Sequence, residues 1–110
     1  MKKAVSLMVA VGLVMTCCLV AFAAPAADAK KGEAVYAKNN CKVCHSIAGV
    51  GSPKSKLDGV GAKLTEDAIT KWIRTPKEMN PKTTMMAYPV AKISDADLAD
   101  LVAYMMTLKK

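Results

Sequence analysis

The spacing of apolar residues along the chain predicts three helices, each with a recognisable start or end. Asp28 is a suitable N-cap for the first helix, and Asn39-Asn40 ends it with residues that favour turns. Thr65 begins the second helix, and Thr75-Pro76 ends it, because the residue before a proline disfavours helical geometry. Ser94 begins the third helix. The apolar positions of the second and third helices are Ile69, Trp72, Ile73, Leu98, Leu101, Val102, Met105 and Leu108.

The connections between these helices are long for so small a chain. Residues 46–64 are rich in glycine, residues 76–93 contain three prolines, and neither segment has the alternation of a convincing strand. We therefore expect an all-α fold with three main helices and long loops. A domain of this size buries only a marginal core by itself, so loops of this length favour a structure wrapped around a large flat ligand.

The N-terminus has the pattern of a secretory signal peptide. Lys2 and Lys3 precede an uncharged, mostly apolar stretch at residues 4–20, and Ala21-Phe22-Ala23 is a small-x-small cleavage site. We predict that residues 1–23 are removed and that residues 24–110 form one domain in the periplasm. The alternative is an uncleaved transmembrane anchor, and membrane association is expected only in that case.

The charge of the chain does not favour a nucleic-acid partner. Lys and Arg number 16 against 9 Asp and Glu, a net charge of +7, and removal of Lys2 and Lys3 leaves +5. The basic residues are scattered and aromatic residues are few, whereas a nucleic-acid-binding segment clusters the two together. Scattered positive charge favours instead a solvated, soluble surface. The alternative is a weak ring of basic residues that steers an acidic redox partner.

The run Cys41-Lys42-Val43-Cys44-His45 has the pattern C-x-x-C-H, which is typical of covalent haem attachment. Two cysteine thiols at this spacing can each add across one vinyl group of the porphyrin, and the histidine can bind the iron from one face. A thioredoxin-like redox pair needs a βαβ setting, and a zinc site needs further ligands, neither of which the sequence offers. Cys17 and Cys18 leave with the signal peptide. We predict one haem c, bound through Cys41 and Cys44, with His45 as an iron ligand.

The other face of the iron needs a different kind of ligand, because His45 is the only histidine in the chain. A methionine thioether is the remaining soft, neutral donor. Met105 falls on the apolar face of the third helix, with Met106 at its edge, where packing is the expected role. The candidates in the loop at residues 76–93 are Met79, Met85 and Met86.

Beyond the signal peptide, the chain resembles the class I c-type cytochromes of the small, single-haem bacterial kind. The motifs that carry the resemblance are Gly32 and Tyr36, Cys41 to His45, Pro76-Lys77-Glu78-Met79-Asn80-Pro81-Lys82-Thr83-Thr84-Met85, and Leu101-Val102-Ala103-Tyr104. The resemblance implies the cytochrome c fold, with loops wrapped around the haem, and Met85 as the second iron ligand. It also implies a helix crossing at Gly32, packed by Tyr36, Leu101 and Tyr104, and a position for Trp72 in the haem pocket.

The sequence departs from this family just after the haem motif. The family commonly has G-P-x-L there, and the proline carbonyl accepts a hydrogen bond from the histidine that binds the iron. The corresponding segment here reads Lys54-Ser55-Lys56-Leu57. A serine carbonyl can do the same work, since the contact uses the backbone, and such a bond orients the ring and raises its basicity.

An iron with a protein ligand on each face has no open position, so the resemblance implies one-electron transfer rather than catalysis. We expect a monomeric carrier, not an enzyme, whose partners are redox proteins that dock transiently at the exposed haem edge. Two alternatives stay open. A five-coordinate haem without a methionine ligand would suit a gas sensor or a weak peroxidase, and an uncleaved N-terminus would suit an anchored subunit of a larger oxidoreductase.

Overall fold

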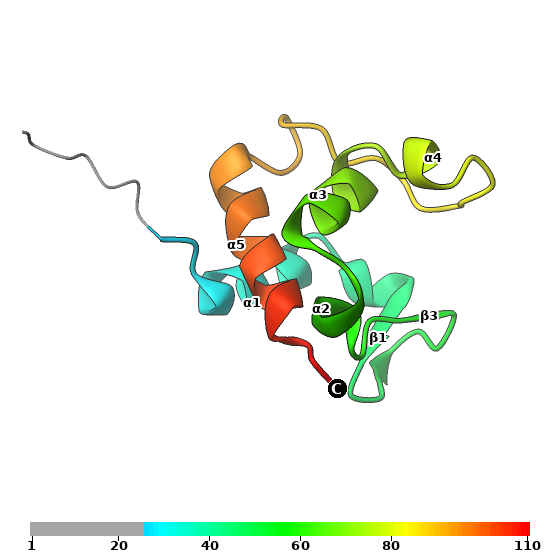
Figure 1. Cartoon of the computed structure of the whole chain (residues 1–110), viewed down its shortest axis with the longest axis horizontal. Coiled ribbons are helices and arrows are strands. Elements are labelled where there is room, and N and C mark those ends of the chain that lie inside the picture. Colours follow the sequence, from blue (N-terminus) through cyan, green and yellow to red (C-terminus); the bar gives the residue numbers. More distant parts are fainter. Residues whose placement is uncertain (1–25) are drawn as a thin grey trace, which may run out of the picture.

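The computed structural model describes residues 26–110, so the predicted signal peptide at residues 1–23 lies outside the described residues. Helices make up most of the ordered elements (Figure 1). In chain order the elements are α1 (Ala29–Lys38), the 3₁₀-helix η1 (Cys41–Val43), β1 (His45–Ile47), β2 (Val50–Gly51), β3 (Ser55–Lys56), α2 (Val60–Lys63), α3 (Glu66–Arg74), α4 (Pro76–Met79) and α5 (Asp95–Thr107). Within residues 26–110, no helix is both long and apolar enough to cross a bilayer.

The three predicted helices are confirmed as α1, α3 and α5, and their predicted caps are present. Each cap side chain accepts a backbone N–H bond within the first turn of its helix, which satisfies a donor that has no partner inside the helix. The pairs are Asp28 with Lys30 at 2.9 Å, Thr65 with Ala68 at 3.2 Å, and Ser94 with Asp97 at 3.1 Å. Local sequence chemistry therefore determines where these helices begin.

The two long connections contain short regular elements that the sequence did not predict. A small sheet with the strand order β2-β1-β3 follows η1, in which β1 pairs antiparallel with β2 and parallel with β3. These strands contain two or three residues each, which is too short for an alternating apolar pattern to appear in the sequence. The four-residue helices α2 and α4 lie in the same two connections.

The crossing of α1 and α5 depends on Gly32. A Cβ atom at this position would lie 1.9 Å from the backbone oxygen of Asp100 and 2.8 Å from the Cβ of Tyr104. Tyr36 and Tyr104 pack beside the crossing with ring centroids 6.0 Å apart in an edge-to-face arrangement, and Leu101 is buried. The helix crossing expected from the family resemblance is confirmed.

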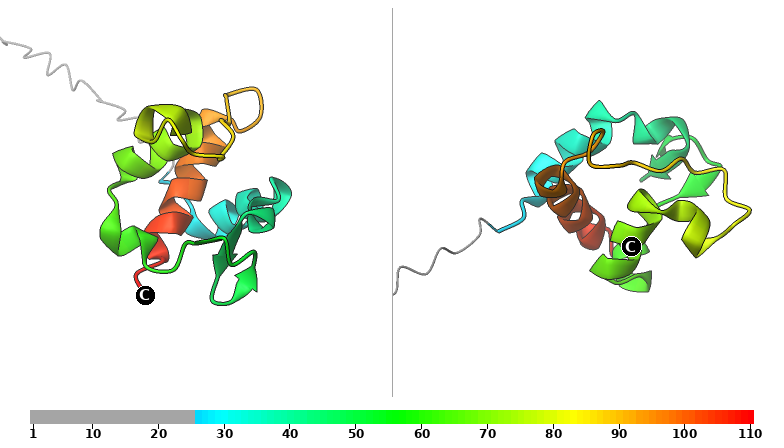
Figure 2. Two further views of the ribbon diagram at one scale, coloured as in Figure 1. Left: turned by 90° about the vertical axis from the view of Figure 1, so that its right-hand side faces the viewer. Right: turned by 90° about the horizontal axis from the view of Figure 1, so that it is seen from above.

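The core lies between α1, α3 and α5, and its buried apolar residues are Val35, Ile69, Ile73, Ile93, Leu98, Leu101, Val102 and Met105. Met105 is only 4% exposed, which confirms its expected packing role. Figure 2 shows α1 and α5 packed together, with η1 and the small sheet on one side of the molecule and α3 and α4 on the other. These two sides carry the candidate site residues, and the helix crossing lies between them. We call them the two walls: η1 with β1 to β3 is the cysteine wall, and α3 and α4 with the loop at residues 76–93 are the methionine wall.

We predict that Gly32→Ala destabilises the folded protein. Helix propensity alone would stabilise α1 by about 0.5–1 kcal/mol, whereas forcing α1 away from α5 costs about 1–3 kcal/mol. Because the added carbon meets backbone atoms rather than a flexible side chain, the second effect should dominate.

Urea denaturation of the haem-loaded protein measures the balance between these effects. Ala34→Gly, at an exposed position of the same helix, calibrates the propensity term. A Gly32→Ala protein more stable than the parent would show that the helices do not cross this closely.

Candidate functional site

The two cysteines of the motif lie where the chain turns out of α1. Asn39 caps the helix, and Asn40 takes a left-handed conformation with φ of 52°, which asparagine tolerates better than most residues. The chain then enters η1, in which Cys41 is partly buried and Cys44 is exposed, both as free thiols. Burial raises the pKa of the Cys41 thiol, so this sulfur is held in its protonated form.

His45 begins β1 and presents a neutral imidazole. Burial lowers its pKa, and the hydrogen bond to Ser55 opposes that effect to a smaller extent. The ring Nδ1 lies 3.3 Å from the backbone oxygen of Ser55 in β3. A carbonyl only accepts hydrogen bonds, so Nδ1 must carry the proton in this contact, and Nε2 keeps a free lone pair for a metal. Ser55 thus supplies the carbonyl that the sequence left open.

Gly51 allows its strand to approach the His45 backbone closely, a role that the sequence analysis missed. It pairs with Ser46 across β1 and β2, and its φ is 110°. A Cβ atom there would lie 2.2 Å from the backbone oxygen of His45. Only glycine accepts both this conformation and this close approach.

The second wall carries the methionine loop. Met85 is partly buried against the core, and its N–H donates to the Thr83 hydroxyl at 3.2 Å. Met86 is 58% exposed and Met79 is 36% exposed. The Lys77 ammonium group donates to the backbone oxygens of Pro81 and Thr83 and so closes the loop. Of the three loop methionines, Met85 alone packs against the core.

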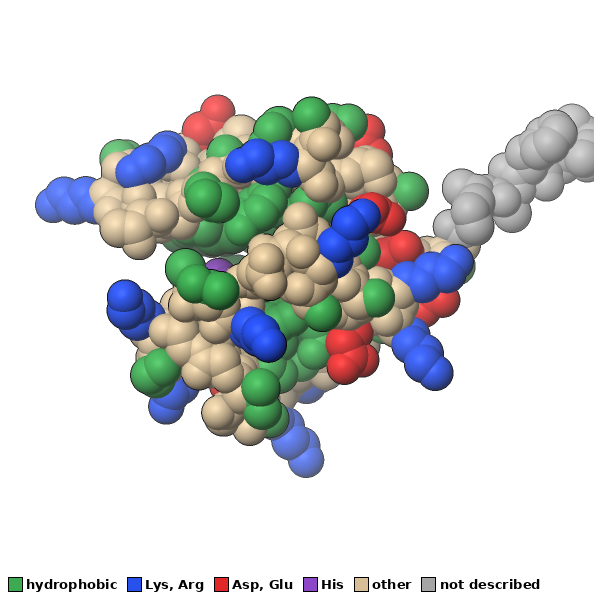
Figure 3. All heavy atoms as spheres, turned by 180° about the vertical axis from the view of Figure 1, so that it is seen from behind, with side chains coloured by type: hydrophobic (Ala, Val, Ile, Leu, Met, Phe, Trp, Pro, Cys, Tyr) green, Lys and Arg blue, Asp and Glu red, His purple; other side chains and the backbone are tan. Residues whose placement is uncertain are grey.

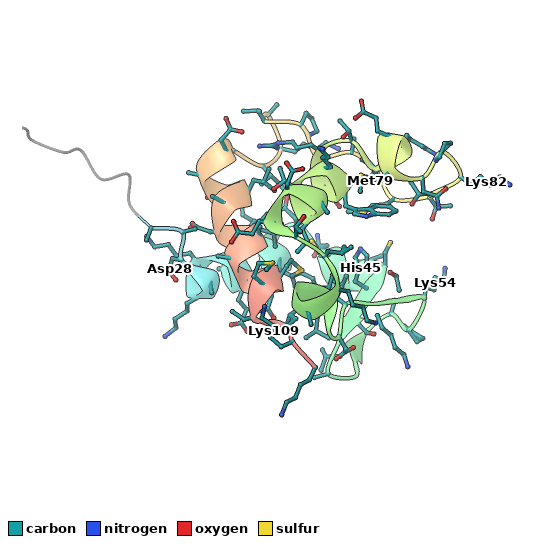
Figure 4. All side chains as sticks on the ribbon, viewed as in Figure 1. Asp28, His45, Lys54, Met79, Lys82 and Lys109 are labelled. Carbon is teal, nitrogen blue, oxygen red and sulfur yellow. The ribbon has the colours of Figure 1, made fainter. Side chains whose placement is uncertain are left out.

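The surface between the two walls is hollowed. In Figure 3 the imidazole of His45, in purple, lies at a gap beneath a group of hydrophobic side chains. In Figure 4 Lys54 and Lys82 lie toward the same end of the molecule as His45, on its two sides. A gap bordered by hydrophobic side chains, with an imidazole visible in it, is consistent with a cofactor site.

Two tyrosines, Tyr88 of the methionine segment and Tyr36 of α1, lie near the cysteines. Burial raises the pKa of Tyr88, and the nearby thiols of Cys41 and Cys44 add to the shift. Burial likewise raises the pKa of Tyr36, with Cys41 as the next contributor. The Tyr36 hydroxyl is buried without a hydrogen-bond partner among the described residues. A buried hydroxyl without a partner fits a site that a bound group completes.

The donor set fits haem. Cys41 and Cys44 offer two thiols from one turn, His45 offers a lone pair from a neutral imidazole, and the hollow between the walls is apolar. Within residues 26–110, no group of three His, Cys, Asp or Glu side chains could hold a metal ion, so no such cluster adds donors for zinc there. The fold and the site are those expected of a small helical domain that holds a covalently attached haem.

Comparison with known proteins gives the family. The cytochrome c family model matches residues 29–109 of the chain. A search of curated proteins and a search of solved structures each found no match. The chain belongs to the cytochrome c family, which binds haem c covalently through a cysteine motif and carries electrons. The expected all-α cytochrome c fold is confirmed. The roles of individual residues, including Trp72 as a lining residue, stay predictions.

We predict that Gly51→Ala destabilises the haem-loaded protein by at least about 1 kcal/mol more than Gly49→Ala does. Both glycines have a positive φ, of 110° and 81° respectively, so both substitutions carry backbone strain. Only at Gly51 does the added carbon meet the His45 backbone, because Gly49 has open space around it. Thermal unfolding followed by circular dichroism measures the difference, and equal losses of stability would mean that Gly51 does not constrain His45.

Proposed function

We propose that this chain is a periplasmic carrier of single electrons. It holds one haem c through Cys41 and Cys44, with His45 and Met85 on the two faces of the iron. The observation that carries the proposal is the neutral His45 imidazole, which directly follows the two cysteines and is oriented by the Ser55 carbonyl. Met85 supports the second ligand, because it alone of the three loop methionines packs against the core. When bound, the haem supplies an iron that gains and loses one electron.

The residues of the site have separate tasks in this proposal. Cys41 and Cys44 tether the cofactor, and Ser55 holds the His45 ring in one tautomer and one orientation. Met85 closes the second face, which leaves no position for a substrate and so disfavours catalysis. A thioether ligand and apolar surroundings would both favour the ferrous state of a bound haem, because ferric haem carries the extra charge.

Charge and exposed apolar surface support transient docking at one end of the molecule. Lys54 and Lys82 lie at the end where His45 lies, and Asp28 lies at the opposite end (Figure 4). Val43, beside the cysteines, is 68% exposed, and Met86, beside the proposed ligand, is 58% exposed. An apolar centre with lysines around it suits a brief encounter with an acidic redox protein.

The N-terminal pattern at residues 1–23 supports the periplasmic location, since haem would then be attached outside the cytoplasm. Retention of that segment would make the same domain an anchored subunit of a larger oxidoreductase.

We expect that Met85→Ala abolishes the far-red sulfur-to-iron charge-transfer band of the oxidised protein and lets the reduced protein bind carbon monoxide readily. Removing the thioether opens one face of the iron, and no second histidine exists to replace it. Absorption spectroscopy of purified holoprotein measures both effects.

Met86→Ala is the matched control for this experiment and should leave the band in place, because that side chain is largely exposed. A band that survives Met85→Ala would assign the iron ligand to Met86 or Met79. Ready carbon monoxide binding by the unmodified protein would instead favour the gas-sensor alternative.

We also expect electron transfer to an acidic acceptor protein to slow as salt rises. Increasing the ionic strength from about 0.01 to 0.1 M shortens the screening length from about 30 to 10 Å, which weakens steering by the lysines. In stopped-flow measurements Lys82→Glu should slow association more than Lys31→Glu, an exposed position of α1, far from the methionine loop. Rates independent of salt would remove electrostatic steering from the proposal.

A further inference from the structure

Arg74, the last residue of α3, makes three hydrogen bonds that the carrier function does not by itself explain. One guanidinium nitrogen, Nη1, donates to the backbone oxygens of Tyr88 at 2.8 Å and Ile93 at 2.6 Å. The other, Nη2, donates to the Asp95 carboxylate at 2.8 Å. The Arg74 side chain is 17% exposed and that of Asp95 is 85% exposed. The guanidinium is therefore committed to a mostly buried junction with the backbone of another segment.

These two carbonyls are the ends of the turn that follows the methionine loop. Ile93 is 1% exposed, and its N–H donates to the oxygen of Pro89, so the turn closes on itself. The N–H of Tyr88 donates to the Ile73 oxygen at 2.9 Å, beside Arg74 on the same helix. The segment that begins at Tyr88, three residues after Met85, is thus fixed to the end of α3 by both a backbone bond to Ile73 and the side-chain bonds of Arg74.

We propose that Arg74 is a positioning residue that holds the Met85 thioether over the iron, an inference that rests on the proposed ligation by His45 and Met85. A guanidinium can serve this junction because it presents five donors in a planar fork, whereas an ammonium is a single point of charge. The bonds to the two carbonyls carry the effect. The pair with Asp95 contributes little, because that carboxylate is open to solvent.

The test measures competition between Met85 and added imidazole for the oxidised iron. Imidazole must displace the thioether, so its apparent affinity reports how firmly the loop presents Met85. Loss of buried hydrogen bonds to a charged group shifts such an equilibrium on the order of 10- to 100-fold. Arg74→Met should therefore bind imidazole tighter by about that factor and weaken the far-red band. Arg74→Lys, which keeps the charge, should move both readouts in the same direction and serves if Arg74→Met does not fold.

Two variants separate this role from a general effect of charge or stability. Lys71→Met removes a cation from an exposed pair with Asp67 on the same helix, and Asp95→Asn removes only the ionic partner of Arg74. Both should bind imidazole as the parent does. The proposal is overturned if the Arg74 variants melt at a lower temperature yet bind imidazole like the parent, or if the two control variants shift the affinity as much.

The same measurements separate this inference from the proposed function. A band that depends on Met85 but not on Arg74 would overturn the positioning role alone. A parent protein without the band would overturn the methionine ligation, and the positioning role with it.

Discussion

The contact between the backbones of α1 and α5 at Gly32 is the constraint on which the rest of the structure depends. At this point any side chain would overlap the backbone oxygen of Asp100. A second tie lies one turn away, where the N–H of Asp28 donates to the Asp100 carboxylate at 2.8 Å. Because α1 leads directly into the cysteine motif and α5 follows directly on the methionine segment, the crossing sets the separation of the two walls.

The two walls are held by different kinds of interaction. On the cysteine side, His45 belongs to a strand with a partner on each edge, and Gly51 lets the neighbouring backbone approach it closely. On the methionine side the long connection between α3 and α5 contains only the four-residue helix α4. There the charged side chains of Lys77 and Arg74 bind backbone carbonyls in place of a strand partner. Backbone pairing holds His45 rigidly, whereas the side-chain hydrogen bonds that hold the methionine segment can be lost through a single substitution.

Sequence reasoning predicted the parts of this molecule that depend on local chemistry. Capping predicted the first residues of the three main helices, because a cap involves residues close together in the chain. The caps are Asp28, Thr65 and Ser94. The small sheet could not be predicted from the sequence, because strands of two or three residues are determined by pairing between separate segments. Sequence reasoning did not distinguish Arg74 from the other scattered basic residues, because two of its three acceptors are backbone oxygens, which the sequence does not reveal. The choice of Met85 among three loop methionines came from the family resemblance, not from periodicity.

The covalent tether proposed at Cys41 and Cys44 would lower the cost of holding an iron ligand by a segment that a single substitution can loosen. In a protein that holds its haem only by bonds between side chains and the iron, opening one loop allows the haem to dissociate into solvent. Here the thioether linkages would keep the porphyrin in place even if the methionine segment opened locally. Evolution is then free to alter the residues of that segment, and with them the redox potential, without risking loss of the cofactor.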